Sequence, residues 1–205
     1  MKKYIIASLI IAAVILFVLL LRSIDFLTPY QKFYAGDVRN FRGNLNEAAK
    51  VPVYPDERSI ISILMNPDVY KIHIAFFPND AENSFYFASS FEITNKLSII
   101  YRSFLGTEVT TFQDKDGSAC MIFYPNKHVR CFKSVPINST DDLIPTPIEP
   151  VILLRGPSTA NRTAVSVENY LITAEGESFQ EEDRDYTDLD LAVDKLILVL
   201  MSVNS

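Results

Sequence analysis

The N-terminal segment constrains this chain more than any other feature. From Tyr4 to Leu21 the sequence YIIASLIIAAVILFVLLL carries no charged residue. A helix rises about 1.5 Å per residue, so this run would span about 27 Å, close to the roughly 30 Å of a bilayer's hydrocarbon core. A cleavable signal peptide has a shorter apolar run and a small-x-small cleavage site, which the following LLLRSIDFL does not offer. We therefore expect an uncleaved transmembrane signal anchor over residues 1–22.

The charges that flank this segment predict its orientation. Lys2 and Lys3 precede it, whereas Arg22 and Asp25 follow it. This bias favours a cytoplasmic N-terminus and an extracytoplasmic C-terminal part. The expected location is the cell membrane, with a single pass that contacts the lipid bilayer through residues 4–21. A pilin-like filament subunit, whose apolar N-terminal helix packs in a filament core, is an alternative, although the small residue usual at its processing site is absent.

Beyond the anchor we expect two regions. Residues 23–50 form a stalk or linker, and residues 51–205 form an extracytoplasmic domain. The segment 135–150, VPINSTDDLIPTPIEP, has four prolines and no periodicity, so it is a long surface loop or a possible sub-boundary. The net charge is −6, with the acidic excess near the C-terminus. A nucleic-acid partner is not expected, because such proteins favour a basic face.

Both cysteines of the chain lie in the stretch CMIFYPNKHVRC. A four-residue loop over 124–127, with Pro125 at the second position of a type I turn, sets Phe123 opposite His128. That register places Cys120 opposite Cys131 in a non-hydrogen-bonded pair, where two backbones approach to about 4.5 Å. We predict a Cys120–Cys131 disulfide, which an extracytoplasmic location allows.

Helical and strand patterns alternate along the rest of the chain. A short extended piece and a helix capped by Asp56 come first. A strand rich in β-branched and aromatic residues follows over 69–77, and a long helix over 81–105 begins after Asn79 or Asp80 and ends at Gly106. Further strands are predicted over 107–113, 118–124, 128–134 and 151–155, then a hairpin that turns at Glu168-Asn169.

These elements predict the fold class. A right-handed crossover through the long helix would make strands 69–77 and 107–113 parallel, while the hairpins add antiparallel strands. The C-terminal LAVDKLILVLMSV predicts a helix capped by Thr187, apolar almost all round, that packs on the sheet or on a partner. We expect an α/β fold: a mixed β-sheet with packed helices and a disulfide-closed hairpin.

The sequence shows no arrangement of catalytic residues. Its two histidines, His73 and His128, exclude a three-histidine metal site, and the nearest approach to a nucleophile turn is Gly156-Pro157-Ser158. Glycine motifs that hold nucleotides are absent, so no cofactor is expected. The acidic segment before the last helix is a candidate calcium site with Asp183, Asp185 and Asp188, for which a solvated loop is the alternative.

Two further features concern the surface. The sequons Asn138-Ser139-Thr140 and Asn161-Arg162-Thr163 make Asn138 and Asn161 candidate glycosylation sites. Aromatic residues gather on the long helix at helical spacing, which favours a place in the core over a ligand cage. They cover more than one of its faces, so a surplus could mark a groove or a self-association surface. They are Phe85, Tyr86, Phe87, Phe91, Tyr101 and Phe104.

Two resemblances are visible. The run VILLRGPSTANRTAV, residues 151–165, is similar to an apolar-strand-then-Gly-Pro element of archaeal S-layer proteins, although Arg155 stands where those proteins often carry glycine. The whole chain, from the basic N-terminus through the cysteine hairpin to YTDLDLAVDKLILVLM, resembles small single-pass surface proteins of archaea. That group has no established activity, so the resemblance implies a surface location and no mechanism.

Together these features predict a membrane-anchored binding or assembly domain of the cell envelope, without catalytic activity. An anchored hydrolase or transferase is the alternative, and it would require a pocket that gathers His73 or His128 with acids or with Ser158. The filament subunit remains a second alternative.

Overall fold

The computed structural model describes residues 45–178 and 187–201, all within one compact unit, Arg42–Val203. The predicted anchor, most of the predicted stalk and the acidic segment 179–186 lie outside these ranges. Within them, no helix is both long enough and apolar enough to cross a bilayer.

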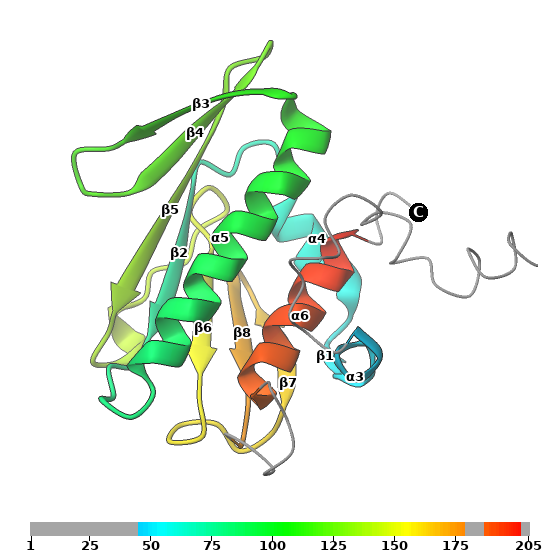
Figure 1. The fold of residues 1–205 in the computed structure, drawn as a ribbon, viewed down its shortest axis with the longest axis vertical. Helices are drawn as coiled ribbons and strands as arrows, with labels where there is room; N and C mark the ends of the chain where they lie inside the picture. Colours follow the sequence, from blue (N-terminus) through cyan, green and yellow to red (C-terminus); the bar gives the residue numbers. More distant parts are fainter. Residues whose placement is uncertain (1–44, 179–186, 202–205) are drawn as a thin grey trace, which may run out of the picture. The chain divides into compact units, whose positions relative to one another are not determined.

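The α/β fold class is confirmed, because eight strands form one mixed sheet with helices packed on it (Figure 1). The strand order is β1-β7-β8-β6-β2-β5-β4-β3. The strands are β1 (Val53–Tyr54), β2 (Lys71–Phe76), β3 (Glu108–Gln113), β4 (Ala119–Tyr124), β5 (His128–Pro136), β6 (Val151–Arg155), β7 (Ala164–Glu168) and β8 (Leu171–Glu175).

Strand β2 lies in the interior of the sheet, parallel to β6 on one side and to β5 on the other. Beyond β5, strands β4 and β3 continue as an antiparallel meander to the edge. The crossover prediction is thus right about direction, since β3 runs parallel to β2, but β5 and β4 lie between them. The burial of the residues explains the difference: β5 holds the buried Cys131 and Phe132, which suit the interior, whereas most of β3 is exposed.

Helices α5 and α6 lie side by side across one face of the sheet, which we call the helix face (Figure 1). Alternate residues of β2, Ile72, Ile74 and Phe76, are buried, and Phe76 stacks on Tyr86 of α5. Helices α3 and α4 pack against α6. The helices are α3 (Leu45–Lys50), α4 (Glu57–Leu64), α5 (Asn83–Leu105) and α6 (Asp188–Met201).

The two predicted helix caps with side chains are present. The Asp56 carboxylate accepts the Ser59 backbone N–H at 3.0 Å. The Thr187 hydroxyl accepts a hydrogen bond from the Asp190 N–H at 3.1 Å, and the Asp190 carboxylate accepts one from the Thr187 N–H, which completes a capping box. Helix α5 differs from the prediction: it begins at Asn83 without a side-chain cap.

Helix α6 is buried on all sides from Leu191 to Met201. It packs on β7 and β8, on α5, and on α3 and α4. This environment explains why its sequence is apolar almost all round, and it agrees with the prediction that the helix packs on the sheet. Residues 45–50, which the sequence placed at the end of a stalk, form helix α3, whose Ala48 is completely buried.

The opposite face of the sheet, which we call the open face, carries no described helix longer than one turn. The proline-rich segment crosses it instead, and Ile137 is buried there against Ala75, Val151 and Leu153, with Leu143 packed beside them. The segment also includes a single 3-10 turn, Thr140–Asp142. It therefore serves as a cover for the middle of the sheet.

Arg130 of β5 joins the helix layer to the sheet. It is 2% exposed, and its guanidinium donates to the backbone oxygens of Asn66 at 2.8 Å, Pro67 at 3.2 Å and Val69. The guanidinium also lies over the ring of Tyr101, 5.3 Å from its centroid. Arg130 thereby ties the segment that follows α4 to the sheet through hydrogen bonds to its carbonyl groups.

Gly106 ends α5 as predicted, and its geometry explains the residue. Its φ is 146°, a region that side chains other than glycine rarely adopt. A Cβ atom at this position would overlap the carbonyl oxygen of Tyr124, at the end of β4. The end of α5 therefore lies in direct contact with the backbone of the β4–β5 hairpin.

Candidate functional site

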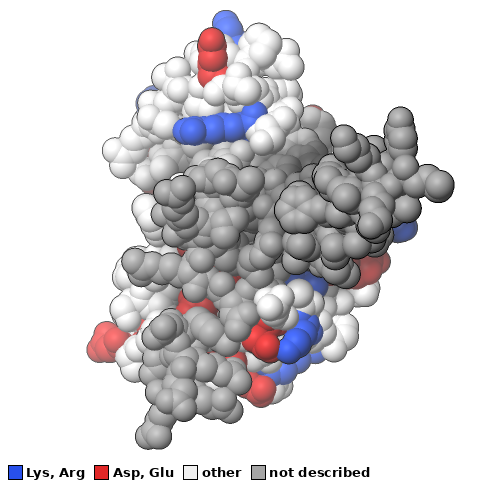
Figure 2. Space-filling model, turned by 45° about the vertical axis from the view of Figure 1, so that its right-hand side comes forward, with Lys and Arg blue, Asp and Glu red and all other residues white. Residues whose placement is uncertain are grey.

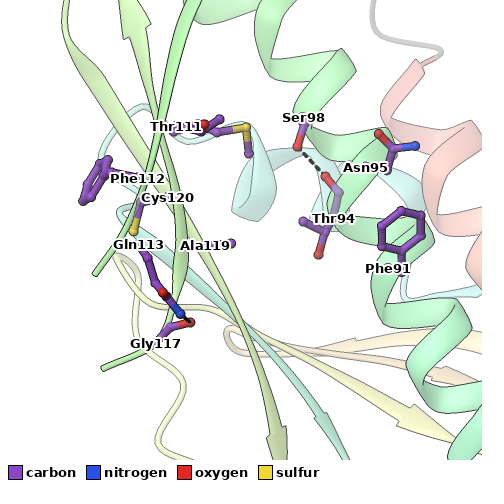
Figure 3. Close-up of a pocket in the computed structure, with 11 residues that line it drawn as sticks. Phe91, Thr94, Asn95, Ser98, Thr111, Phe112, Gln113, Gly117, Ala119 and Cys120 are labelled. Atoms are coloured by element: carbon purple, nitrogen blue, oxygen red, sulfur yellow. Dashed lines mark hydrogen bonds between the residues drawn. The ribbon is translucent and has the colours of Figure 1, made fainter. Parts of the chain in front are cut away.

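The helix layer stops short of one end of the sheet. Helix α5 is the last helix on that side, and β3 extends beyond it without a described helix above it (Figure 1). A groove of about 540 Å³ lies between α5 and the β3–β4 hairpin. Figure 3 shows the side chains that α5 contributes, which are Phe91, Thr94, Asn95 and Ser98, facing those of the hairpin, which include Thr111, Gln113 and Ala119.

Two phenylalanines of α5 stand exposed along the groove. Phe91 lines the groove and is 73% exposed, and Phe87, one turn earlier, is 58% exposed. The ring of Phe87 meets that of Phe76 edge-on, with 5.5 Å between the centroids. In contrast, Tyr86 and Tyr101 of the same helix are buried. Exposed aromatic rings beside a groove are typical of protein interaction surfaces.

The polar groups of the α5 wall are largely satisfied by the helix itself. The Thr94 hydroxyl donates to the carbonyl of Ser90 at 2.9 Å, and the Ser98 hydroxyl donates to the carbonyl of Thr94 (Figure 3). Asn95 is exposed, and its side-chain amide makes no hydrogen bond to another described residue. The wall therefore offers carbon surface and one amide, which is a surface for packing with a single polar contact.

A second hollow, of about 470 Å³, continues the groove beside the β3–β4 turn and shares Phe91 and Thr94 with it. Asp116 and Lys133 line this hollow. The Asp116 carboxylate accepts from Lys71 at 2.8 Å and Lys133 at 3.3 Å, and the hydrogen bond from Lys71 holds the pKa of Asp116 well below its usual value. This end of the groove is therefore charged but internally neutralised.

The charges elsewhere are mixed. On the face shown in Figure 2, acidic and basic side chains of the described residues are interspersed and form no patch of one sign. The absence of a nucleic-acid partner stays a prediction from the overall charge.

The predicted disulfide between Cys120 and Cys131 is present, with the two residues directly opposite in β4 and β5 and their Cα atoms 4.0 Å apart. The predicted register is also correct, because Phe123 pairs with His128. The turn differs from type I: the Tyr124–Pro125 peptide is cis and Lys127 has a φ of 57°. The bond ties β4, which lines the groove, to β5 in the body of the sheet.

The two histidines and Ser158 do not meet in one place, although His73 shares a pocket with the acids Asp142 and Glu149. His73 lies on the open face, with Nε2 3.2 Å from a Glu149 carboxylate oxygen. His128 lies five residues before the strand partner of His73, roughly 16 Å away along β5. A pocket of about 460 Å³ surrounds His73, and none of its lining residues carries a hydroxyl or a thiol.

Ser158 belongs to a different cluster, at the carboxyl end of β6. Its hydroxyl donates to Glu82 at 2.9 Å, and Tyr86 donates to the same carboxylate. The Gly156 N–H in turn donates to the Tyr86 hydroxyl at 2.9 Å. Burial and the bond to Glu82 raise the pKa of Tyr86 to about 12. Since Ser158 has a carboxylate partner and no histidine beside it, this cluster is best explained as a tie between the start of α5 and β6.

The remaining predicted sites are only partly described. Asp183 and Asp185 lie outside the described residues, while Asp188 begins α6 and accepts a hydrogen bond from the Ser178 hydroxyl at 2.6 Å. The calcium hypothesis therefore stays a prediction. Asn138 and Asn161 are both exposed, so a glycan could reach either residue.

Sequence reasoning named Phe91 among six aromatic residues of the long helix without singling it out, and it missed Thr111, Gln113 and Met121 on the strand side. A signal was available: EVTTFQ carries polar residues on both of its alternating faces, which indicates a strand that nothing covers.

No family model, no curated protein and no solved structure matches this chain.

Proposed function

We propose that this chain is a membrane-anchored extracytoplasmic domain that binds or assembles with another component of the cell envelope and has no catalytic role. The observation that carries the binding role is the groove between α5 and the β3–β4 hairpin, with Phe87 and Phe91 exposed along it. The apolar run 4–21 supports the anchor. The Cys120–Cys131 disulfide supports an oxidising compartment, because such bonds persist outside the cytoplasm.

The lining of the groove defines the chemistry of its ligand. Phe91 and Met121 supply apolar surface, and Asn95 supplies one amide that another molecule can bond. An aromatic or aliphatic side chain laid against Phe91 would gain most from such a surface. The groove is open along β3, so it suits an extended segment of a protein rather than a small molecule that must be enclosed.

The location is tested with a C-terminal epitope tag on the full chain. In intact cells a membrane-impermeant reagent should label the tag, and alkaline extraction should leave the protein in the membrane fraction. A tag labelled only after lysis, or a mature protein that lacks residues 1–22 in the soluble fraction, would contradict the anchor and its orientation.

The groove is tested by site-specific photo-crosslinking. A photoreactive phenylalanine analogue replaces Phe91 in the full chain, and the matched control replaces Phe104, which is on the same helix, 38% exposed and not part of the groove lining. The probe at position 91 should form a discrete adduct that Ala119→Lys abolishes, since Ala119 lines the groove and is exposed. Equal adducts from both positions, or adducts that Ala119→Lys leaves unchanged, would show that the groove is not the binding surface.

A further inference from the structure

The two edges of the sheet differ in their exposure to strand pairing. Strand β1, at one edge, is two residues long. Strand β3, at the other edge, is six residues long and contains no proline and no lysine. Natural proteins protect sheet edges with short strands, proline, lysine or bulges, because an unprotected edge pairs with another strand. Strand β1 is protected by its shortness, whereas β3 has one charged residue, Glu108 at its first position, and otherwise shows none of these devices.

The register with β4 shows which backbone groups of β3 face outward. In the turn that joins them, the Asp114 N–H donates to the Ser118 carbonyl at 2.9 Å. Hydrogen-bonded pairs alternate along an antiparallel ladder, so Phe112 and Thr110 also exchange bonds with β4. The N–H and C=O groups of the intervening residues, Val109, Thr111 and Gln113, therefore point away from the sheet.

We propose that β3 pairs antiparallel with β3 of a second copy of this chain, about a two-fold axis through Thr111. A two-fold axis that joins two edge strands into one sheet stands perpendicular to the sheet, so it keeps each side chain on its own face. Residues directly opposite must then share a face, which restricts the axis to a residue position. The candidates at the centre of β3 are Thr110 and Thr111.

The hydrogen bonds decide between these two registers. With the axis at Thr111, Thr111 pairs with its own copy and Val109 pairs with Gln113 of the other copy. All outward N–H and C=O groups of Val109, Thr111 and Gln113 are then bonded. With the axis at Thr110, Val109 pairs with Thr111 of the other copy, and Gln113 is left opposite Thr107, which precedes the strand.

The side chains fit the register at Thr111 except at its ends. Phe112, 41% exposed, lies beside Thr110 of the other copy on the open face. Aromatic rings packed on β-branched neighbours stabilise antiparallel pairs. At each end Glu108 comes opposite Asp114 of the other copy, and these like charges oppose pairing. Glu108 is exposed, and Asp114 is half-buried with an ion pair to Lys71 at 3.7 Å. Because both acids are at the ends of the pair, this repulsion weakens the contact and does not change the register.

Pairing would also change the proposed binding site. The two grooves would face each other across four strands, β4 and β3 of each copy, with an α5 helix along each side. Neighbouring strands are about 4.8 Å apart, so the outer two would be about 14 Å apart. The inference extends the proposed function in this respect only: the second copy completes the surface that each groove begins.

Cysteine substitution tests the register in the full chain in its own membrane. Both native cysteines are held in the disulfide, so an introduced cysteine has no free native thiol to react with. Thr111→Cys should give a reducible dimer whose link joins position 111 to position 111, because residues on the axis lie within bridging distance. Thr110→Cys is the matched control and should form no disulfide-linked dimer, because residues 110 of the two copies lie diagonally, about 7–8 Å apart. A dimer from Thr110→Cys alone, or no dimer from Thr111→Cys, would overturn the proposal.

Charge substitution tests the same contact without a covalent link. The dimer fraction of the purified full chain is measured by mass photometry across a range of concentrations. Thr111→Lys places two ammonium groups at the axis and should abolish the dimer. Glu108→Lys places a cation opposite Asp114 and should lower the dimer dissociation constant about three- to ten-fold. A dimer that neither change affects would be held by the anchor instead, and the proposal would fail.

The two proposals fail separately. If Thr111→Cys gives no dimer while the Phe91 probe still forms an adduct with another protein that Ala119→Lys abolishes, self-pairing is wrong and the proposed function stands. If Thr111→Cys gives the dimer while the Phe91 probe reacts only within it, self-pairing stands and the binding of a different envelope component is wrong.

Discussion

The two ends of the sheet differ in how far helices cover them. At one end, α6 covers β7 and β8 and is itself buried from Leu191 to Met201. At the other end, β3 is exposed over most of its length, and α5 leaves Phe87 and Phe91 in solvent. Both ends belong to one fold and share one sheet. The comparison shows that the β3 end is a regular part of the sheet, because β3, β4 and β5 are paired up to the edge and a disulfide joins β4 to β5.

The largest expected effect is on the free energy of unfolding, at the end of the sheet that α6 covers. Leu196 of α6 is completely buried, so Leu196→Ala should lower the free energy of unfolding by about 4 kcal/mol through lost burial and a residual cavity. Urea denaturation followed by circular dichroism measures it. A loss under about 1 kcal/mol would show that α6 contributes little to the core.

The pH dependence of stability tests the same end. Asp194 of α6 is 2% exposed, and one of its carboxylate oxygens has no hydrogen-bond partner. Burial first, then the nearby Glu92 and Asp190, raise the pKa of Asp194 to about 8, although Lys96 acts in the opposite direction. The folded state therefore keeps this proton at pH values where the unfolded chain, with a pKa near 3.8, releases it.

The contribution of Asp194 to stability should consequently be largest below pH 4 and fall as the pH rises to about 8, by up to about 1.4 kcal/mol per unit, whereas Asp116, whose pKa is lowered, acts in the opposite direction at acidic pH. Asp194→Asn should remove this dependence, so that the variant gains about 3 kcal/mol on the parent between pH 5 and pH 7. Urea midpoints at several pH values measure the difference. Parallel pH profiles for parent and variant would contradict a protonated Asp194.

Removal of the disulfide tests how much this bond contributes to stability at the β3 end of the sheet. Closing a loop of this length is expected to stabilise the fold by about 2–3 kcal/mol through the entropy of the unfolded chain. Replacing Cys120 and Cys131 together with serine should cost that amount, and reduction of the parent should reproduce it. If the double variant keeps its stability, β4 and β5 are held by their hydrogen bonds and packing alone.

The smallest expected effect on stability comes from Phe91, at the β3 end of the sheet. Phe91 is 73% exposed, so Phe91→Ala should change the free energy of unfolding by less than about 0.5 kcal/mol. Recovery of the bound partner with the tagged chain should nevertheless fall sharply. Phe104→Ala is the matched control, and it should leave recovery unchanged. Recovery that falls equally in both variants would place the partner elsewhere on α5.

Local features of the fold were predictable because local physics sets them. The opposition of Cys120 and Cys131 followed from the length of their loop, and the caps at Asp56 and Thr187 followed from side chains that satisfy free N–H groups. The strand order did not follow, because the pairing of β2 with both β5 and β6 depends on which strands are most apolar across the whole chain.

The candidate site was half predictable for the same reason. Periodicity showed that α5 carries more aromatic residues than one buried face can take, but it did not show that Phe87 and Phe91 are the exposed ones. It could not show that the helix layer ends at α5, since that depends on where each helix lies over the sheet. Thr111 and Met121 therefore became part of a groove only through the tertiary arrangement.

Gly106 links the width of the groove to a single residue. The end of α5 touches the backbone at Tyr124 so closely that only a residue without a side chain fits, and the backbone conformation there also excludes most others. A substitution at this position would act as a spacer between one wall of the groove and the sheet. It would change the shape that a ligand meets while every lining residue stayed the same, so variation in binding preference could arise at a position that no ligand touches.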